Sequence, residues 1–66
     1  MDYEYDFYYE DGFGDKYSSD VFDNLPDCRE EIRRLESTGH TITRTFKYIK
    51  CIMDNRSGEY KGSFNF

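Results

Sequence analysis

The sequence predicts an α+β fold: a four-stranded antiparallel sheet in β-β-α-β-β order, with one helix packed on one face. Two hairpin patterns and one helical pattern predict it, because alternating segments flank a single stretch whose apolar residues recur at spacings of three and four. The length of 66 residues leaves room for one domain, residues 1–66, with one small core. Because a single helix covers only one side of a sheet, the other side must face water, a second copy or a target.

The first strand is predicted over residues 2–9, in the segment MDYEYDFYYE. With a period of two, one face carries the rings of Tyr3, Tyr5, Phe7 and Tyr9. The opposite face carries acids and one further ring, namely Asp2, Glu4, Asp6, Tyr8 and Glu10. The first ten residues contain no base, so the counter-charge must come from another strand or from a partner.

The second strand is predicted over residues 16–22, after the turn EDGFGD. Gly12 and Gly14 give this turn the backbone freedom that it needs. The strand alternates between Tyr17, Ser19 and Val21 on one side and Lys16, Ser18, Asp20 and Phe22 on the other. Together with the first strand it forms a predicted hairpin.

The helix is predicted over residues 25–38. Asn24 is a good N-cap, Pro26 is tolerated in the first turn, and Gly39 ends the helix. The apolar stripe that should pack on the sheet consists of Leu25, Cys28, Ile32 and Leu35. Charged side chains are left for solvent, namely Asp27, Glu30, Glu31, Arg33 and Arg34.

The third strand is predicted in the segment TITRTFKYIKCIM, residues 41–53, where neither face is cleanly apolar. A bulge near Lys47 that moves Ile42 and Phe46 onto the face of Ile49, Cys51 and Met53 would restore an apolar face. The fourth strand follows the turn DNRSG, with an aromatic face predicted from Tyr60, Gly62, Phe64 and Phe66.

The charge is divided unevenly along the chain, whose net charge is −5. Residues 1–31 hold eleven acids and two bases, and residues 32–66 hold seven bases and three acids. The start at Met1 is unlike a signal peptide, and no stretch approaches the length of a membrane span. We therefore expect the protein in the cytoplasm, with Cys28 and Cys51 as reduced thiols; a disulfide between them is the alternative.

No enzyme chemistry is predicted, and no metal or cofactor. His40 lies alone just past the helix end, where a cap or surface role is expected. Cys28 lies on the apolar stripe, which predicts a packed core thiol. The segment DGFGDKYSSD lacks the spacing of a calcium loop, and NRS at Asn55 is predicted to be a turn.

The acidic first half is one binding signal. Alternate strand residues lie about 6.6–6.8 Å apart, close to the separation of successive phosphates, so a ladder of carboxylates could occupy a basic nucleic-acid channel. The predicted partner-binding residues are Asp2, Glu4, Asp6, Tyr8, Glu10, Asp11, Phe13 and Asp15. Tyr8 and Phe13 would serve as local anchors. The plain alternative is a solvated face that guards a strand edge against aggregation.

The third strand is the other binding signal. Bases alternate with rings, as in strands that stack single-stranded bases, and the residues concerned are Arg44, Phe46, Lys47, Tyr48 and Lys50. The net charge opposes nucleic acid, and pairing with the acids of the first strand would explain these bases without a ligand. We therefore expect direct nucleic-acid binding to be weak.

Aromatic residues exceed what one helix can cover, since the chain holds seven tyrosines and six phenylalanines. Those expected at the surface are Tyr8, Phe13, Tyr48 and Phe66. An uncovered sheet face rich in such rings predicts self-association, for which a homodimer is the simplest form.

A short acidic chain with NLPDCREEIRRLESTG between two hairpins and a DNRSGEY turn resembles the small proteins that phages make early in infection. Anti-CRISPR proteins and other inhibitors of host nucleic-acid enzymes are the best-known class among them. The likeness is one of architecture, so no functional residue is carried over. It implies stoichiometric inhibition by occlusion and negative-charge mimicry, with a CRISPR effector as the first candidate target. The alternatives are a small single-strand-binding module and a dimeric assembly protein.

Overall fold

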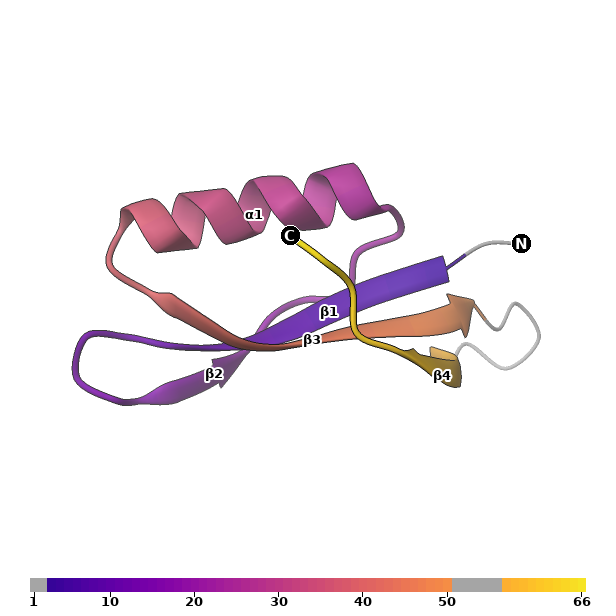
Figure 1. The fold of residues 1–66 in the computed structure, drawn as a ribbon, viewed down its shortest axis with the longest axis horizontal. Coiled ribbons are helices and arrows are strands. Elements are labelled where there is room, and N and C mark those ends of the chain that lie inside the picture. The colour runs from indigo at the N-terminus through magenta and orange to yellow at the C-terminus, as the bar shows by residue number, and fades with distance from the viewer. Residues whose placement is uncertain (1–2, 51–56) are drawn as a thin grey trace.

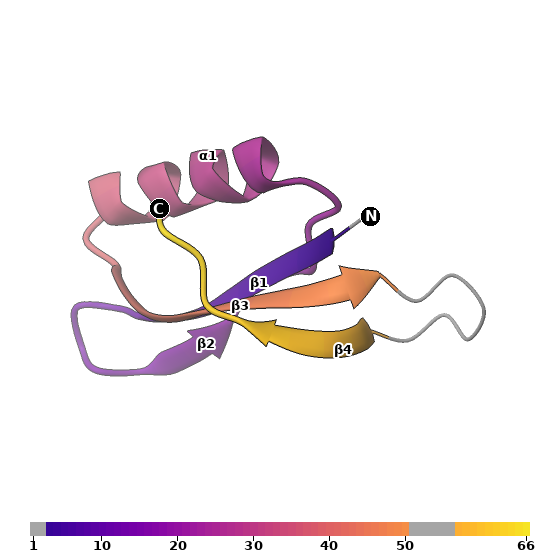
Figure 2. The same ribbon diagram turned by 45° about the vertical axis from the view of Figure 1, so that its right-hand side comes forward.

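The computed structural model describes residues 3–50 and 57–66 of the chain. Its elements are β1 (Tyr3–Glu10), β2 (Lys16–Ser18), α1 (Leu25–Ser37), β3 (Thr41–Lys50) and β4 (Ser57–Gly62). The strands form one antiparallel sheet in the spatial order β2-β1-β3-β4, and α1 lies between β2 and β3 in the chain. Figures 1 and 2 show α1 on one side of the sheet. The predicted α+β class, with one helix and a four-stranded antiparallel sheet, is confirmed.

Helix α1 begins and ends close to the predicted residues because its local signals are strong. The side chain of Asn24 accepts a hydrogen bond from the Asp27 amide at 2.9 Å and caps the first turn. At the other end, Gly39 adopts a φ of 88°, which a residue with a side chain rarely adopts. Cys28 and Ile32 on the predicted stripe are buried, as expected.

The core is small and lies between α1 and the odd-numbered residues of β1. Phe7, Cys28 and Ile32 are buried to 1% exposure or less. Partly buried residues packed against them are Tyr5, Tyr9, Phe22, Leu35, Ile42 and Phe64. The predicted aromatic face of the first strand is therefore the core face, which leaves Glu4, Asp6 and Tyr8 on the other side.

A bulge in β3 differs from the predicted one in position. Tyr8 pairs with Arg44 and Tyr9 pairs with Ile42, so the register between β1 and β3 skips Thr43. The bulge brings Ile42 to the core face, but Phe46 stays on the opposite face, and the prediction that Phe46 joins Ile49 was wrong. Residues 51–53, which were also assigned to these faces, lie outside the described residues.

Thr45 takes the core position that the prediction gave to a neighbouring apolar residue. It is buried, and its hydroxyl donates to the Phe64 carbonyl at 2.9 Å and accepts from the Phe64 amide at 3.1 Å. Both hydrogen-bonding functions are thus satisfied, and a polar residue is tolerated there.

Strand β2 is shorter than the predicted 16–22. The Ser19 hydroxyl accepts a hydrogen bond from the Phe7 amide at 2.9 Å, which takes the place of a ladder bond at that point. The chain then leaves β1 and returns at Phe22, which forms an isolated bridge with Tyr5. Val21, between these points, is exposed.

The C-terminal segment crosses to the helix side of the sheet after β4 (Figure 2). Gly62 makes this change of direction with a φ of 111°. The Phe64 ring then packs edge-on against Tyr5 at 5.5 Å between centroids, and the Arg29 guanidinium donates to the Asn65 carbonyl. Tyr60 and Phe64, predicted to share one aromatic face, therefore lie on opposite sides of the sheet.

Candidate binding face

The face of the sheet opposite α1, here called the open face, collects side chains from three strands. They are Glu4, Asp6 and Tyr8 of β1, Arg44, Phe46 and Tyr48 of β3, and Tyr60 of β4. Pairing sets the rows: Glu4 lies opposite Tyr48, Asp6 opposite Phe46, and Tyr8 opposite Arg44. No helix of the described chain covers this face (Figure 1). Three of the eight predicted partner-binding residues and three of the five predicted nucleic-acid-binding residues thus lie on one surface.

Aromatic rings form a connected cluster across the open face, with Phe46 at its centre. The Phe46 centroid lies 4.8 Å from Tyr8, 6.3 Å from Tyr48 and 6.1 Å from Tyr60. Tyr48 and Tyr60 are themselves 5.7 Å apart. Tyr8 and Tyr60 remain about half exposed, at 46% and 52%. The cluster therefore presents ring surface to whatever lies against the sheet.

A guanidinium already lies on this cluster. The central carbon of the Arg44 guanidinium is 5.2 Å from the Phe46 centroid, which is within the range of cation–π attraction. Arg44 is also exposed, so its charge is available at one end of the open face. The sequence pattern predicted Arg44 and Phe46 as neighbours but did not predict this contact.

Two carboxylates lie beside the rings. Asp6 Oδ1 is buried and has no hydrogen-bond partner among the described residues. Burial first, and then the charge of Glu4, raises the pKa of Asp6. Burial, followed by the charge of Asp6, also raises the pKa of Tyr48. The ionised form of Asp6 is therefore less stable, relative to the protonated form, than that of a fully solvated aspartate.

The predicted ladder of acids is interrupted at Asp11, which organises the turn between β1 and β2. Its carboxylate accepts from the Phe13 amide at 2.8 Å, the Asp15 amide at 3.0 Å and the Tyr17 hydroxyl at 3.0 Å. Desolvation alone would raise the pKa of Asp11, but these hydrogen bonds together lower it. Asp11 is thus a structural residue of the turn, outside the open face.

The other predicted partner-binding residues lie in or beside the turn between β1 and β2, apart from the aromatic cluster of the open face. Phe13 is 94% exposed, and Asp15 is exposed beside it. Glu10 pairs in register with Lys16 and borders a shallow pocket of about 590 Å³, whose wall also includes Tyr8, Tyr17 and Arg44. Asp2 lies outside the described residues. The predicted partner-binding residues therefore do not form one row.

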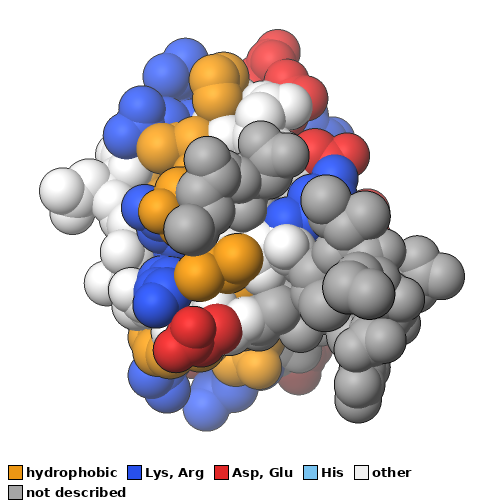
Figure 3. Space-filling model, turned by 90° about the vertical axis from the view of Figure 1, so that its right-hand side faces the viewer, with side chains coloured by type: hydrophobic (Ala, Val, Ile, Leu, Met, Phe, Trp, Pro, Cys, Tyr) orange, Lys and Arg blue, Asp and Glu red, His pale blue; other side chains and the backbone are white. Residues whose placement is uncertain are grey.

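The bases of β3 do not pair with the acids of β1 as predicted. The Lys47 ammonium lies 4.1 Å from the Tyr3 centroid, and the Lys50 ammonium pairs with Asp23 at 3.3 Å. Across residues 3–50 and 57–66, no ion pair joins a carboxylate of β1 to a base. The end view in Figure 3 shows basic side chains mainly along the left edge, beside hydrophobic ones, and acidic side chains in separate places.

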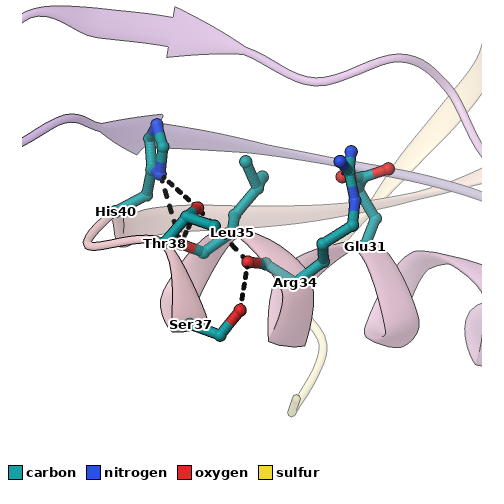
Figure 4. A network of polar contacts seen from close by, with 6 residues as sticks. All are labelled: Glu31, Arg34, Leu35, Ser37, Thr38 and His40. Carbon is teal, nitrogen blue, oxygen red and sulfur yellow. Dashed lines mark hydrogen bonds and ion pairs between the residues drawn. The ribbon is translucent and has the colours of Figure 1, made fainter.

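His40 has a local structural role. Its Nδ1 lies 3.0 Å from the Thr38 hydroxyl and 3.2 Å from the Leu35 carbonyl, and the Thr38 hydroxyl also donates to that carbonyl (Figure 4). Arg34 pairs with Glu31 one turn earlier. These contacts hold the C-terminal end of α1, and the prediction of His40 as a cap is confirmed.

Cys28 is a buried thiol in the core, as expected. Burial first, and then the charges of Asp6 and Glu31, raises its pKa to about 11. The thiol is therefore protonated at neutral pH and is a poor nucleophile. Its proposed companion Cys51 lies outside the described residues. In the part of the chain that the structure describes, no cluster of His, Cys, Asp or Glu could hold a metal ion.

Comparison with protein-family models, with curated proteins and with solved structures found no match to this chain. No described helix has both the length and the apolar character needed to cross a membrane. The open face is therefore the feature of the molecule from which a function can be inferred. Tyr60 is the member of that face that neither predicted binding set included; its aromatic character was visible in the sequence, but its position opposite Tyr48 follows from the register of β3 with β4.

Proposed function

We propose that the protein is a non-catalytic inhibitor that binds a host nucleic-acid-handling protein through the open face, with a CRISPR effector as the first candidate. The observation that carries this proposal is the uncovered aromatic cluster around Phe46, bordered by Glu4 and Asp6. Tyrosine and phenylalanine are enriched in the cores of protein interfaces, where a few buried rings supply most of the affinity.

The acids support a basic target. Glu4 and Asp6 are alternate residues of one strand, so their backbone positions lie about 6.6–6.8 Å apart, which suits a surface that normally contacts successive phosphates. Because Asp11 is used within the turn, the negative-charge mimicry proposed here depends on these two residues. The rings would provide affinity, and the carboxylates would provide steering and specificity.

A second candidate function is single-strand nucleic-acid binding. Its support is the arrangement of Phe46, Tyr48 and Arg44 on an uncovered antiparallel sheet, which is how some RNA-binding sheets stack bases. Glu4 and Asp6 on the same face would repel phosphates, and Lys47 and Lys50 have other contacts. We therefore favour a protein target.

Self-association through the open face stays a prediction. A second copy would cover the residues that the proposed target needs, so the two complexes would compete. Sedimentation over a micromolar concentration range tests for a dimer, and target binding should weaken as any dimer forms.

The proposal is tested with a panel of purified, guide-loaded CRISPR effector complexes. Added protein should suppress target-DNA binding by at least one complex at a near-stoichiometric ratio. Tyr48→Ser and Tyr60→Ser should each weaken that inhibition roughly tenfold or more, as expected of interface rings. Val21→Ser removes an exposed apolar side chain outside the open face and is the control. No inhibition across the panel, or equal loss with Val21→Ser, would contradict the proposal.

A further inference from the structure

The open face combines two kinds of group that recognise the same ligand chemistry. Asp6 lies directly opposite Phe46 in the pairing of β1 with β3, and Glu4 lies opposite Tyr48. Each carboxylate is therefore adjacent to a ring on the same surface. Ring faces attract cations, and carboxylates accept charge-assisted hydrogen bonds from them.

We propose that the open face binds an arginine side chain of its protein partner, with the guanidinium between the rings of Phe46 and Tyr48 and the carboxylates of Glu4 and Asp6. The inference rests on the proposed function and names the chemistry by which that partner is recognised. A guanidinium fits better than an ammonium because it is planar, stacks on rings and donates two parallel hydrogen bonds to one carboxylate.

The protein's own Arg44 supports the ring half of this site. Its guanidinium carbon lies 5.2 Å from the Phe46 centroid, so the cluster already accepts a guanidinium from one side. Arg44 lies opposite Tyr8, two residues along the strands from the pair of Asp6 with Phe46. The described chain shows no ion pair between Arg44 and Glu4 or Asp6, so the carboxylate half has no described cation.

The state of Asp6 supports the carboxylate half. Its Oδ1 is buried without a hydrogen-bond partner among the described residues, and burial together with Glu4 raises its pKa. A guanidinium bound beside the carboxylate would stabilise its ionised form through opposite charge, which is screened less at a partly buried group than in bulk water. The partner's arginine therefore gains more at Asp6 than at an exposed, solvated acid.

The probes are two capped peptides, hexa-arginine amide and hexa-lysine amide, titrated into the full chain at about 0.15 M salt, where interactions between distant exposed charges are screened. Amide and aromatic NMR shifts locate the bound peptide. We expect shifts at Asp6, Phe46 and Tyr48, and at least about threefold tighter binding of the arginine peptide. Shifts spread over the acids of α1, or no binding of either peptide, would overturn the proposal.

Matched variants separate the site from net charge. Asp6→Asn should weaken arginine-peptide binding roughly tenfold, and Asp20→Asn, which removes the same charge from an exposed position, should leave it unchanged. Tyr48→Leu should abolish the preference for arginine over lysine. Glu4→Gln provides a second carboxylate variant, and thermal melts confirm that each variant is folded. Equal weakening by Asp20→Asn would overturn the proposal.

Two further results are distinguishable. Shifts that appear on concentrating the protein alone and vanish in Arg44→Gln, without a response to either peptide, would assign the face to a second copy and overturn the proposal. If an effector complex is inhibited through the open face but the arginine preference is missing, this inference fails and the proposed function stands. If the peptides bind as expected but no effector is inhibited, the site stands and the proposed function fails.

Discussion

At the residue scale, Asp6 lies on a ring-lined surface with one carboxylate oxygen buried and no described hydrogen-bond partner. Its pKa is raised in the folded protein, so the folded state binds more protons than the unfolded state between the two pKa values. Stability contributed by this group is therefore lost as pH rises through that window. An aspartate at this position therefore lowers the stability of the fold at neutral pH. A role of Asp6 in binding a cation would explain why the position is acidic.

Asp6→Asn is therefore expected to stabilise the protein at neutral pH by less than about 1 kcal/mol, because the carboxyl is only partly buried and solvent screens its charge. Urea midpoints at pH 7 and near pH 3 measure the effect. The gain should disappear at the lower pH, where the wild-type carboxyl is protonated in both states. A loss of stability at pH 7 would show that the ionised carboxylate is satisfied in the fold.

Asp11 shows the opposite behaviour. Although desolvation opposes it, hydrogen bonds lower the pKa of Asp11, so its contribution is present above the unfolded pKa and is lost as pH falls through the lower folded value. Asp11→Ala should reduce the hydrogen-exchange protection of the Asp15 amide at neutral pH. Asp15→Ala, which keeps that amide, is the control. Unchanged protection in Asp11→Ala would mean that the turn is held by its backbone alone.

At the scale of elements, α1 is attached to the sheet by very few fully buried side chains. Ile32 is 1% exposed and contacts the core with Phe7 and Cys28. Ile32→Ala should destabilise the protein by about 2–5 kcal/mol, enough to unfold much of a domain this small. The urea midpoint measures it, with Arg33→Ala on the exposed side as the control. Equal midpoints for the two variants would contradict the assigned core face.

The elements whose signals are local were predictable from the sequence. The cap at Asn24, the spacing of Cys28 and Ile32, and the alternation in β1 each act within a few residues. The bulge was predicted near Lys47 but lies at Thr43. The sequence pattern could not show this, because the core position of Thr45 depends on hydrogen bonds with Phe64, which is distant in sequence. The short β2 likewise depends on the Ser19 hydroxyl bonding to Phe7.

The candidate site was predictable only in part for the same reason. Glu4, Asp6 and Tyr8 follow from the period of β1, whereas Phe46 stays on the open face only because the bulge lies at Thr43. Tyr60 joins the cluster through the pairing of β4 with β3, which sequence alternation alone does not align. A surface built from three strands requires the register of all three.

At the scale of the whole molecule, the open face carries two acids and one base, so it does not favour phosphates. A mobility shift with short RNA or single-stranded DNA at physiological salt should therefore be absent. Glu4→Gln combined with Asp6→Asn should make weak binding detectable if the acids are what exclude nucleic acid. Sub-micromolar binding by the wild type that Tyr48→Ala abolishes would instead favour the nucleic-acid function.

Binding of a basic protein target by the open face should be visible in the kinetics of association. Association rates with an inhibited effector complex are measured across a salt series for the wild type and for the open-face variant, Glu4→Gln/Asp6→Asn. The control is Glu30→Gln/Glu36→Gln, which removes the same charge from exposed positions of α1. We expect a slower association rate and a smaller salt dependence for the open-face variant alone. Identical kinetics for the open-face variant and the α1 control would contradict this expectation.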